Sequence, residues 1–177
     1  MARNIEIKAR VASIEALLPL ARALADHGPD IIEQDDTFFA CAQGRLKLRV
    51  FDDGRGELIA YQRADASGPK TSDYLIAPVA DPDALRATLA RALGVTGRVV
   101  KRRTLYRVGR TRVHLDRVAG LGDFLELEVV LREGEPADLG VAEAHALLDR
   151  LQVDAAQLIA GAYVDLLHAT RGLGAPP

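Results

Sequence analysis

Strict alternation of charged and apolar residues is the feature of this chain that most constrains its fold. Near the N-terminus, Glu6, Lys8 and Arg10 alternate with aliphatic residues. Successive side chains of a β-strand point to opposite faces, so such a segment has one apolar face and one charged face. In three later segments the charged positions are Arg45, Lys47 and Arg49; Arg112, His114 and Asp116; and Glu126 and Glu128. Many cations with a few carboxylates on one concave surface describe a site for a polyanion and its metal ion.

The alternation alone does not determine which face of the sheet lies inside. One interpretation is an ordinary barrel or half-open sheet with an apolar core and a solvated charged face. The other is a tunnel whose charged faces point inward and whose apolar faces are covered by amphipathic helices. We favour the tunnel, because the charged faces contain few of the uncharged polar residues that are common on a solvated sheet.

Turn and capping signals divide the chain into expected strands and helices. Strands are expected at residues 3–12, 30–41, 45–52, 56–65, 73–79, 96–108, 110–118 and 123–132. Helices are expected from Ser13 to about Gly28, from Asp81 to Gly94 with Leu85, Leu89, Ala92 and Leu93 facing inward, and at 138–151 and 154–168. The order predicts a mainly β, α+β fold: a closed or nearly closed antiparallel tunnel of eight strands with a charged interior and covering helices.

Length and composition limit the classes of function. The chain has 177 residues, 49% of them hydrophobic, which fits one globular domain over residues 1–170 with a flexible tail at 171–177. A net charge of −2 argues against a general nucleic-acid binder. Cys41 is the single cysteine, so no disulfide framework or cysteine-based zinc site is expected. Without a signal segment or an apolar run of about 18 residues, we expect a cytoplasmic protein that does not bind membranes.

Several segments together resemble the CYTH superfamily, the triphosphate tunnel metalloenzymes. They read NIEIK at residues 4–8, QDDTFF at 34–39, RLKLR at 45–49, LIAYQR at 58–63, KRR at 101–103, RVHLD at 112–116, GLG at 120–122 and FLELE at 124–128. The last three look most like the class IV adenylyl cyclase branch. The first is similar to the ExExK signature of the family but has Asn4 where the signature has its first Glu.

Triphosphate chemistry needs cations that hold the phosphates and a hard divalent ion. The candidate phosphate-binding residues are Lys8, Arg45, Lys47, Arg49, Arg63, Lys101, Arg103 and Arg112. The candidate ligands of Mg²⁺ or Mn²⁺ are Glu6, Glu126, Glu128 and Asp116. Glu6, Lys8 and Asp116 are the candidate catalytic residues, with Asp116 as a metal ligand or a base. Asp35 and Asp36 are adjacent, so only one of them can face inward.

The resemblance implies an enzyme whose partner is a small triphosphate-containing molecule such as ATP, tripolyphosphate or thiamine triphosphate. The first hypothesis is a class IV adenylyl cyclase-like activity that converts ATP to cyclic AMP and pyrophosphate. A triphosphatase that hydrolyses tripolyphosphate, thiamine triphosphate or a nucleoside triphosphate is the alternative in the same fold. A non-catalytic nucleotide- or polyphosphate-binding domain is the second alternative, because Asn4 removes one anionic ligand. The helices at 138–168 either cover the barrel or form the surface of a homodimer.

Overall fold

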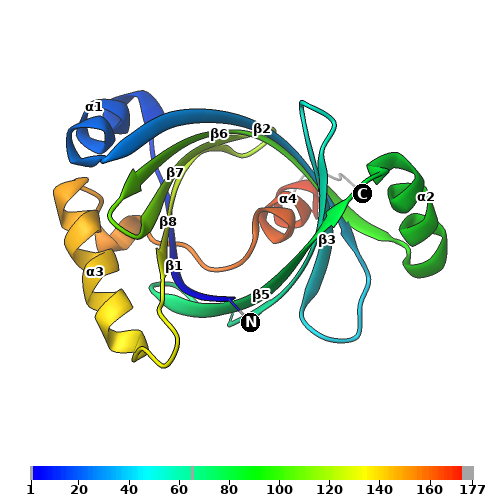
Figure 1. The fold of residues 1–177 in the computed structure, drawn as a ribbon. Coiled ribbons are helices and arrows are strands. Elements are labelled where there is room, and N and C mark those ends of the chain that lie inside the picture. The colour runs from blue at the N-terminus through cyan, green and yellow to red at the C-terminus, as the bar shows by residue number, and fades with distance from the viewer. Residues whose placement is uncertain (1, 65, 173–177) are drawn as a thin grey trace.

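Eight antiparallel strands close into a barrel in a computed structural model that describes residues 2–64 and 66–172 (Figure 1). The strands are β1 (Ala2–Arg10), β2 (His27–Phe39), β3 (Arg45–Phe51), β4 (Gly56–Arg63), β5 (Lys70–Val79), β6 (Val95–Val108), β7 (Thr111–Val118) and β8 (Gly122–Val130). Around the barrel they follow the order β1-β5-β4-β3-β2-β6-β7-β8. Strand β5 begins before the predicted residue 73, because Lys70 to Tyr74 pair with β1. The predicted closed antiparallel fold is confirmed.

Helices α1 (Ile14–Leu24), α2 (Pro82–Leu93), α3 (Ala137–Arg150) and α4 (Tyr163–Gly172) lie outside the strands of the barrel or at its end. Helix α1 ends before the predicted residue 28, because the chain becomes extended at Ala25 and β2 starts at His27. The helix predicted at 154–168 is wrong. That stretch holds a short 3₁₀ helix, η1 (Ala155–Gln157), an extended segment and the start of α4.

The extended segment between η1 and α4 exists because it pairs with the barrel. Leu158 forms a β-bridge with Ala9, and the Ile159 amide donates to the Lys8 carbonyl oxygen at 2.9 Å. Gly161 then adopts a positive φ of 80°, which favours glycine, before α4 begins. Strand pairing therefore overrides the helical pattern at these positions. Residues 173–177 of the expected tail lie outside the described residues.

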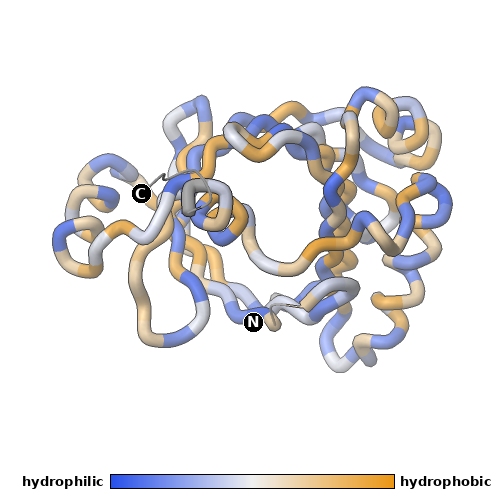
Figure 2. The backbone as a smooth tube through the Cα atoms, turned by 180° about the vertical axis from the view of Figure 1, so that it is seen from behind, coloured by the Kyte–Doolittle hydropathy of each residue, from blue (hydrophilic) through white to orange (hydrophobic). Residues whose placement is uncertain are grey.

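The main hydrophobic core lies between the outer wall of the barrel and two helices, not inside the barrel. Ile5 and Ile7 of β1 and Leu127 of β8 are at most 1% exposed and share one cluster with residues of α1 and α3. Figure 1 shows both helices along the same side of the barrel. Hydrophilic and hydrophobic residues are interleaved along the strands in Figure 2. The apolar faces therefore point outward under helices, as the tunnel interpretation predicts.

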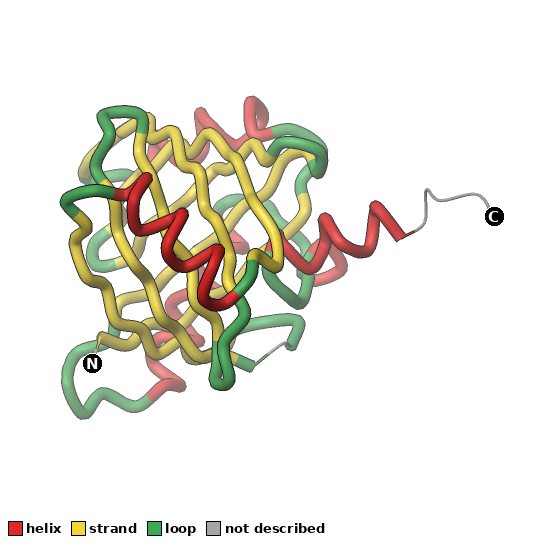
Figure 3. The backbone as a smooth tube through the Cα atoms, turned by 90° about the vertical axis from the view of Figure 1, so that its right-hand side faces the viewer, coloured by secondary structure: helices red, strands yellow, loops and turns green. Residues whose placement is uncertain are grey.

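The other two helices contribute differently. Helix α2 crosses the outer wall of the barrel in Figure 3, and none of its residues is fully buried. Of the residues expected to face inward, Leu85 and Leu89 are half-buried, whereas Ala92 and Leu93 are exposed. Helix α4 projects from one end of the barrel, where Val164 and Leu167 join a second cluster with Phe38 and Phe124. Within the described ranges, no helix is both long and apolar enough to span a lipid bilayer.

Candidate functional site

A cavity of about 340 Å³ lies inside the barrel, and both cations and carboxylates line it. Among the described residues, the cations that line it are Lys8, Lys47, Arg49, Arg63, Lys101, Arg103 and Arg112. The carboxylates that line it are Glu6, Asp36, Glu57, Glu126 and Glu128. Seven of the eight predicted phosphate-binding residues are therefore brought together around one space.

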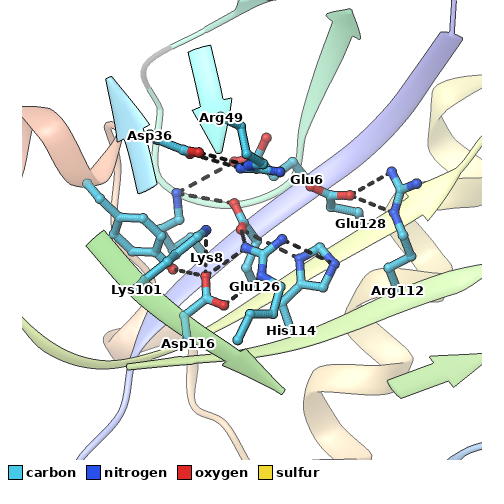
Figure 4. A network of polar contacts seen from close by, with 12 residues as sticks. Glu6, Lys8, Asp36, Arg49, Lys101, Arg112, His114, Asp116, Glu126 and Glu128 are labelled. Carbon is cyan, nitrogen blue, oxygen red and sulfur yellow. Dashed lines mark hydrogen bonds and ion pairs between the residues drawn. The ribbon is translucent and has the colours of Figure 1, made fainter. Parts of the chain in front are cut away.

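The strand register explains how opposite charges come to lie side by side (Figure 4). Lys8 of β1 is opposite Glu126 of β8, and Glu126 is opposite His114 of β7. Directly opposite residues have Cβ atoms about 4.5–5.5 Å apart, so their side chains interact. The Lys8 Nζ atom lies 3.2 Å from Glu126 Oε1, and Arg103 Nη2 donates to Glu126 Oε2 at 2.8 Å. Burial raises the pKa of Glu126, but Lys8 and the other neighbours hold it well below its usual range.

Glu128 and Glu6 form the next row of the ladder towards the N-terminal end of β1. They are opposite one another, and Glu128 is also opposite Arg112. Arg112 Nε donates to Glu128 Oε2 at 2.7 Å, whereas Glu6 is paired with Arg63 and lies 3.7 Å from the Lys8 ammonium. In this row Glu128 is thus paired with the cation of the neighbouring strand β7, and Glu6 with Arg63 of β4 and, at longer range, with Lys8 of its own strand.

Of the two adjacent acids Asp35 and Asp36, Asp36 is the one that faces the interior of the barrel. Its carboxylate is 2% exposed and accepts from Lys47 Nζ at 2.7 Å and from Arg49 Nε at 2.8 Å. Asp35 points outward and pairs with Arg98 at 2.6 Å. Burial raises the pKa of Asp36, but Arg49 and Lys47 outweigh it and keep this carboxyl ionised far below its usual range. Asp36 therefore holds two predicted phosphate-binding residues in place.

Asp116 does not lie in the expected position of a metal ligand. It is fully buried, does not line the cavity, and has both oxygens engaged by Arg103 at 2.7 Å. One of these oxygens also accepts from Lys101 Nζ and from the Tyr163 hydroxyl, each at 3.0 Å. With both oxygens occupied behind the cavity wall, Asp116 is better placed as a counter-ion for two cations than as a metal ligand or base.

Arg45 is the predicted phosphate-binding residue that does not line the tunnel cavity. Its guanidinium forms an ion pair with Asp165 of α4 at 2.8 Å and borders a neighbouring pocket beside that helix. The nearby Arg63 does line the tunnel, and its Nη2 atom donates to the Gly161 carbonyl oxygen at 2.9 Å. The start of α4 is thus attached to cations at this end of the barrel.

Tyr163, the first residue of α4, was missed by the sequence reasoning. The Lys8 ammonium lies 4.2 Å and the Lys101 ammonium 4.9 Å from the centroid of its ring. Such cation–π contacts are favourable, more so when water is excluded. No local sequence signal reveals this role, because the segment was predicted as a covering helix and only the path of the chain across the barrel end brings the ring inside.

Three residues are close enough to share one metal ion: His114, Glu126 and Glu128. Their potential ligand atoms all lie within 4.8 Å of one another. Burial and Arg103 lower the pKa of His114, which favours the neutral imidazole that a metal requires. Its Nδ1 atom is buried, has no hydrogen-bond partner in the described part of the chain, and lies 3.6 Å from Glu126 Oε2. Its Nε2 atom faces the Arg103 guanidinium at 3.4 Å, and that donor favours the tautomer with the proton on Nδ1, so Glu126 and Glu128 are better candidate ligands than His114. The donor set fits a divalent cation held chiefly by carboxylate oxygens, with Mn²⁺ tolerating the imidazole better than Mg²⁺.

Several neutral side chains gather at the end of the cavity opposite α4, where they lie beside Glu57 of β4 and Arg112 of β7. Strand β3 runs from Arg45, which contacts α4, to Phe51 at this opposite end. The apolar residues that line the cavity there are Ile32, Phe51, Ile76 and Leu105, and Tyr74 and Gln34 also line it. Ile76 is 50% exposed, in keeping with a position at the opening. We call this set of six residues the neutral mouth.

Together, the closed antiparallel barrel and the charged side chains that line its cavity define the protein as a β-tunnel protein. The chain belongs to the CYTH domain family, whose family model matches residues 2–163. No curated protein matches the sequence.

Solved structures support this assignment. The PH1012 protein of Pyrococcus horikoshii is 25% identical, with a TM-score of 0.81 over 92% of this chain and 98% of its own. A Vibrio parahaemolyticus protein described as a candidate adenylate cyclase is 19% identical, with a TM-score of 0.76 over 93% and 97%. HpAC1 of Hippeastrum, a candidate adenylyl cyclase described as having a dominant triphosphatase activity, is 18% identical, with a TM-score of 0.59 over 89% and 90%. The last two establish a shared fold alone.

Proposed function

We propose that this protein is a metal-dependent enzyme that acts on an organic triphosphate, with conversion of ATP to cyclic AMP and pyrophosphate as the first candidate reaction. The observation that carries the proposal is that one cavity combines seven cations with the apolar and amide side chains of the neutral mouth. Family membership supports a triphosphate substrate, because CYTH proteins are typically cyclases or triphosphatases.

The charged interior suits the triphosphate group. A triphosphate spreads its negative charge over several oxygens, and its transfer reactions depend mainly on positioning and electrostatic stabilisation. The seven cations outnumber the five carboxylates that line the cavity, so the lining has an excess of positive charge. Arg49 and Arg103 already donate from Nε and Nη2 to Asp36 and Asp116, so phosphate oxygens would be bound by the other donors of these two guanidinium groups.

The neutral mouth supports an organic triphosphate over inorganic tripolyphosphate. A tripolyphosphate ion has no apolar surface and would gain nothing from Ile32, Phe51 or Ile76. A nucleotide or thiamine ring could bury apolar area there while its phosphates reach the cations. Both requirements are met by one molecule with a flat organic end and a polyanionic end.

A divalent ion would be held by Glu126 and Glu128, with His114 and Glu6 beside them. Such an ion supplies charge neutralisation at the phosphates and acidifies a coordinated hydroxyl or water. Lys8 and Arg103 bracket Glu126 and can bind the departing phosphate oxygens. Arg112 orients Glu128, and Tyr163 closes the cavity behind Lys8 and Lys101.

A triphosphatase is the second candidate. It is supported by the structural likeness to HpAC1, which is described as having a dominant triphosphatase activity. The two reactions differ in the attacked atom: a ribose hydroxyl attacks the α-phosphorus in a cyclase, whereas water attacks a terminal phosphorus in a triphosphatase. The third candidate is a non-catalytic binding role. It is supported by Asn4, a neutral residue that lines the cavity and is 3% exposed.

Product analysis separates these reactions. Purified protein is incubated with ATP, thiamine triphosphate or tripolyphosphate and with Mg²⁺ or Mn²⁺, and nucleotides, pyrophosphate and phosphate are quantified. The cyclase proposal expects cyclic AMP and pyrophosphate in equal amounts; ADP with phosphate would indicate the triphosphatase. Glu126→Gln should lower turnover at least about a hundredfold, whereas the exposed Asp53→Asn should not. Tripolyphosphate as the one substrate turned over would refute the organic-substrate proposal.

A further inference from the structure

Gln34 is a buried amide with an unused hydrogen-bonding atom inside the cavity. The residue is 5% exposed and lines the cavity. Its Oε1 atom is buried and has no hydrogen-bond partner among the described residues. Buried polar atoms are nearly always paired, because an unpaired one loses its interaction with water without compensation. An orphaned amide oxygen that faces a cavity therefore points to a ligand that completes its bonding.

The register places Gln34 where the neutral mouth meets the charged interior. It is directly opposite Phe51 of β3 on one side and Lys101 of β6 on the other. Along its own strand, Ile32 lies on the mouth side and Asp36 on the interior side, and both line the cavity. A molecule whose phosphates contact the cations would place the group attached to them beside Gln34 and the Phe51 ring.

We propose that Gln34 is a specificity-determining residue that reads the edge of an adenine base stacked near Phe51; this inference rests on the proposed organic triphosphate substrate. A carboxamide offers one donor and one acceptor in a fork that matches the N6 amine and N7 of adenine. Aromatic side chains stack on bases without regard to their identity, so Phe51 supplies affinity and Gln34 supplies selectivity.

The neighbouring cation supports adenine over guanine. Guanine presents the two acceptors O6 and N7, which Lys or Arg reads best. Lys101, the cation opposite Gln34, is 4% exposed and is paired with Asp116 at 3.0 Å. Adenine can be bound by the Gln34 amide alone, so its recognition leaves the ion pair between Lys101 and Asp116 intact.

Equilibrium binding without divalent cations tests the proposal, because no turnover then disturbs the measurement. Isothermal titration of the full chain is carried out in EDTA with ATP, GTP, 7-deaza-ATP, which lacks the N7 acceptor, and tripolyphosphate. Gln34→Met, which keeps the length and removes both polar groups, should weaken ATP binding about tenfold to a hundredfold and leave tripolyphosphate binding within about twofold. Gln62→Met, at an exposed position of β4, is the matched control and should bind ATP normally.

The wild-type protein provides a test that needs no variant. It should bind ATP at least about fivefold more tightly than 7-deaza-ATP, and Gln34→Met should bind the two equally. Equal affinity of the wild type for ATP and 7-deaza-ATP would overturn the role of Gln34 while leaving the proposed function intact, as would equal losses for ATP and tripolyphosphate in Gln34→Met. Wild-type binding of tripolyphosphate without measurable binding of ATP would overturn both proposals.

Discussion

Single charged residues inside the tunnel are stabilised by their neighbours, since water has little access to them. Asp36 joins Lys47 to Arg49, and Asp116 joins Lys101 to Arg103. Each buried carboxylate thus holds two cations in fixed positions before a substrate arrives. Pre-positioned cations lose less entropy on binding phosphate than mobile ones.

Asp116→Asn should destabilise the protein strongly, because it leaves Lys101 and Arg103 buried with a neutral amide. Removing one partner of a buried ion pair typically costs about 3–5 kcal/mol. We expect a loss of that order in the free energy of unfolding, measured by urea denaturation, and a partial recovery with tripolyphosphate, whose anionic oxygens replace the lost charge. Asp53→Asn, which alters an exposed pair with Arg55, is the control and should change stability little. Equal stability of the two variants would show that Asp116 is not a required counter-ion.

Lys101 should make phosphate binding sensitive to alkaline pH. Burial and Arg103 lower the pKa of Lys101 to about 8 from its ordinary value of 10.5, although Asp116 opposes the shift. Between these two values the unfolded chain holds the Lys101 proton and the folded chain does not, so the contribution of Lys101 to stability rises with pH in this window. The positive charge available to a ligand falls over the same range.

We therefore expect the affinity of the wild type for tripolyphosphate to fall relative to that of Lys101→Arg as pH rises from about 7 to 9.5, because arginine stays protonated. Titration calorimetry of both proteins at each pH checks this. The ratio between them removes the effect of ionisation of tripolyphosphate itself. A constant ratio would mean that Lys101 stays charged throughout or does not contact the ligand.

Among the structural elements, α4 is the one that joins the protein surface to the site. Its first residue, Tyr163, contacts Lys8 and Lys101, and Asp165 pairs with Arg45. The helix packs very closely on β6: a Cβ atom added at Gly97 would overlap the Val164 side chain and would lie 3.1 Å from the His168 ring. The absence of a side chain at Gly97 is what allows this approach.

Gly97→Ala should displace α4 and cost about 1–3 kcal/mol of stability, as overpacking typically does. Val164→Ala in the same protein should recover part of that loss, because it removes the atom that a new Cβ would meet first. Thermal unfolding of the wild type, both single variants and the double variant gives the coupling between the two sites. Additive effects without coupling would indicate that α4 does not depend on contact at Gly97.

At the scale of the whole molecule, the fold separates charged side chains from apolar ones. The barrel wall turns its charged faces inward to the cavity and its apolar faces outward to α1 and α3. The net charge of −2 therefore says little about the tunnel, where cations outnumber carboxylates. An excess of enclosed cations is destabilising by itself and is relieved by a bound polyanion.

Tripolyphosphate should consequently stabilise the whole domain. A ligand that binds the folded state alone adds about 2.7 kcal/mol at a hundred times its dissociation constant. We expect the midpoint of thermal unfolding to rise with ligand concentration and the rise to shrink as NaCl is added, because the contacts are electrostatic. Inorganic phosphate at equal ionic strength is the control and should give a smaller shift. No shift at saturating tripolyphosphate would argue against a polyanion site in the tunnel.

The sequence by itself determined the strands and which residues of each strand share a face, because period-two alternation is a local property of each segment. Glu6, Lys8, Lys47, Arg49 and Arg103 were predicted to face one space, and they do line it. The boundaries of α2 were predicted equally well, since Asp81 caps it and Gly94 ends it. These features depend on residues close together in the chain, so local physical chemistry is enough to find them.

Only the tertiary structure decided which charged side chains pair with one another. Asp116 alternates with the other inward residues, yet its oxygens are occupied by Arg103, Lys101 and Tyr163 behind the cavity wall. The path of residues 158–163 across the barrel end follows from pairing with β1, more than 140 residues earlier in the chain. Contacts between such distant segments depend on barrel closure and register, which no local pattern encodes. For that reason the position of residues 158–163 at the barrel end could not be predicted from the sequence.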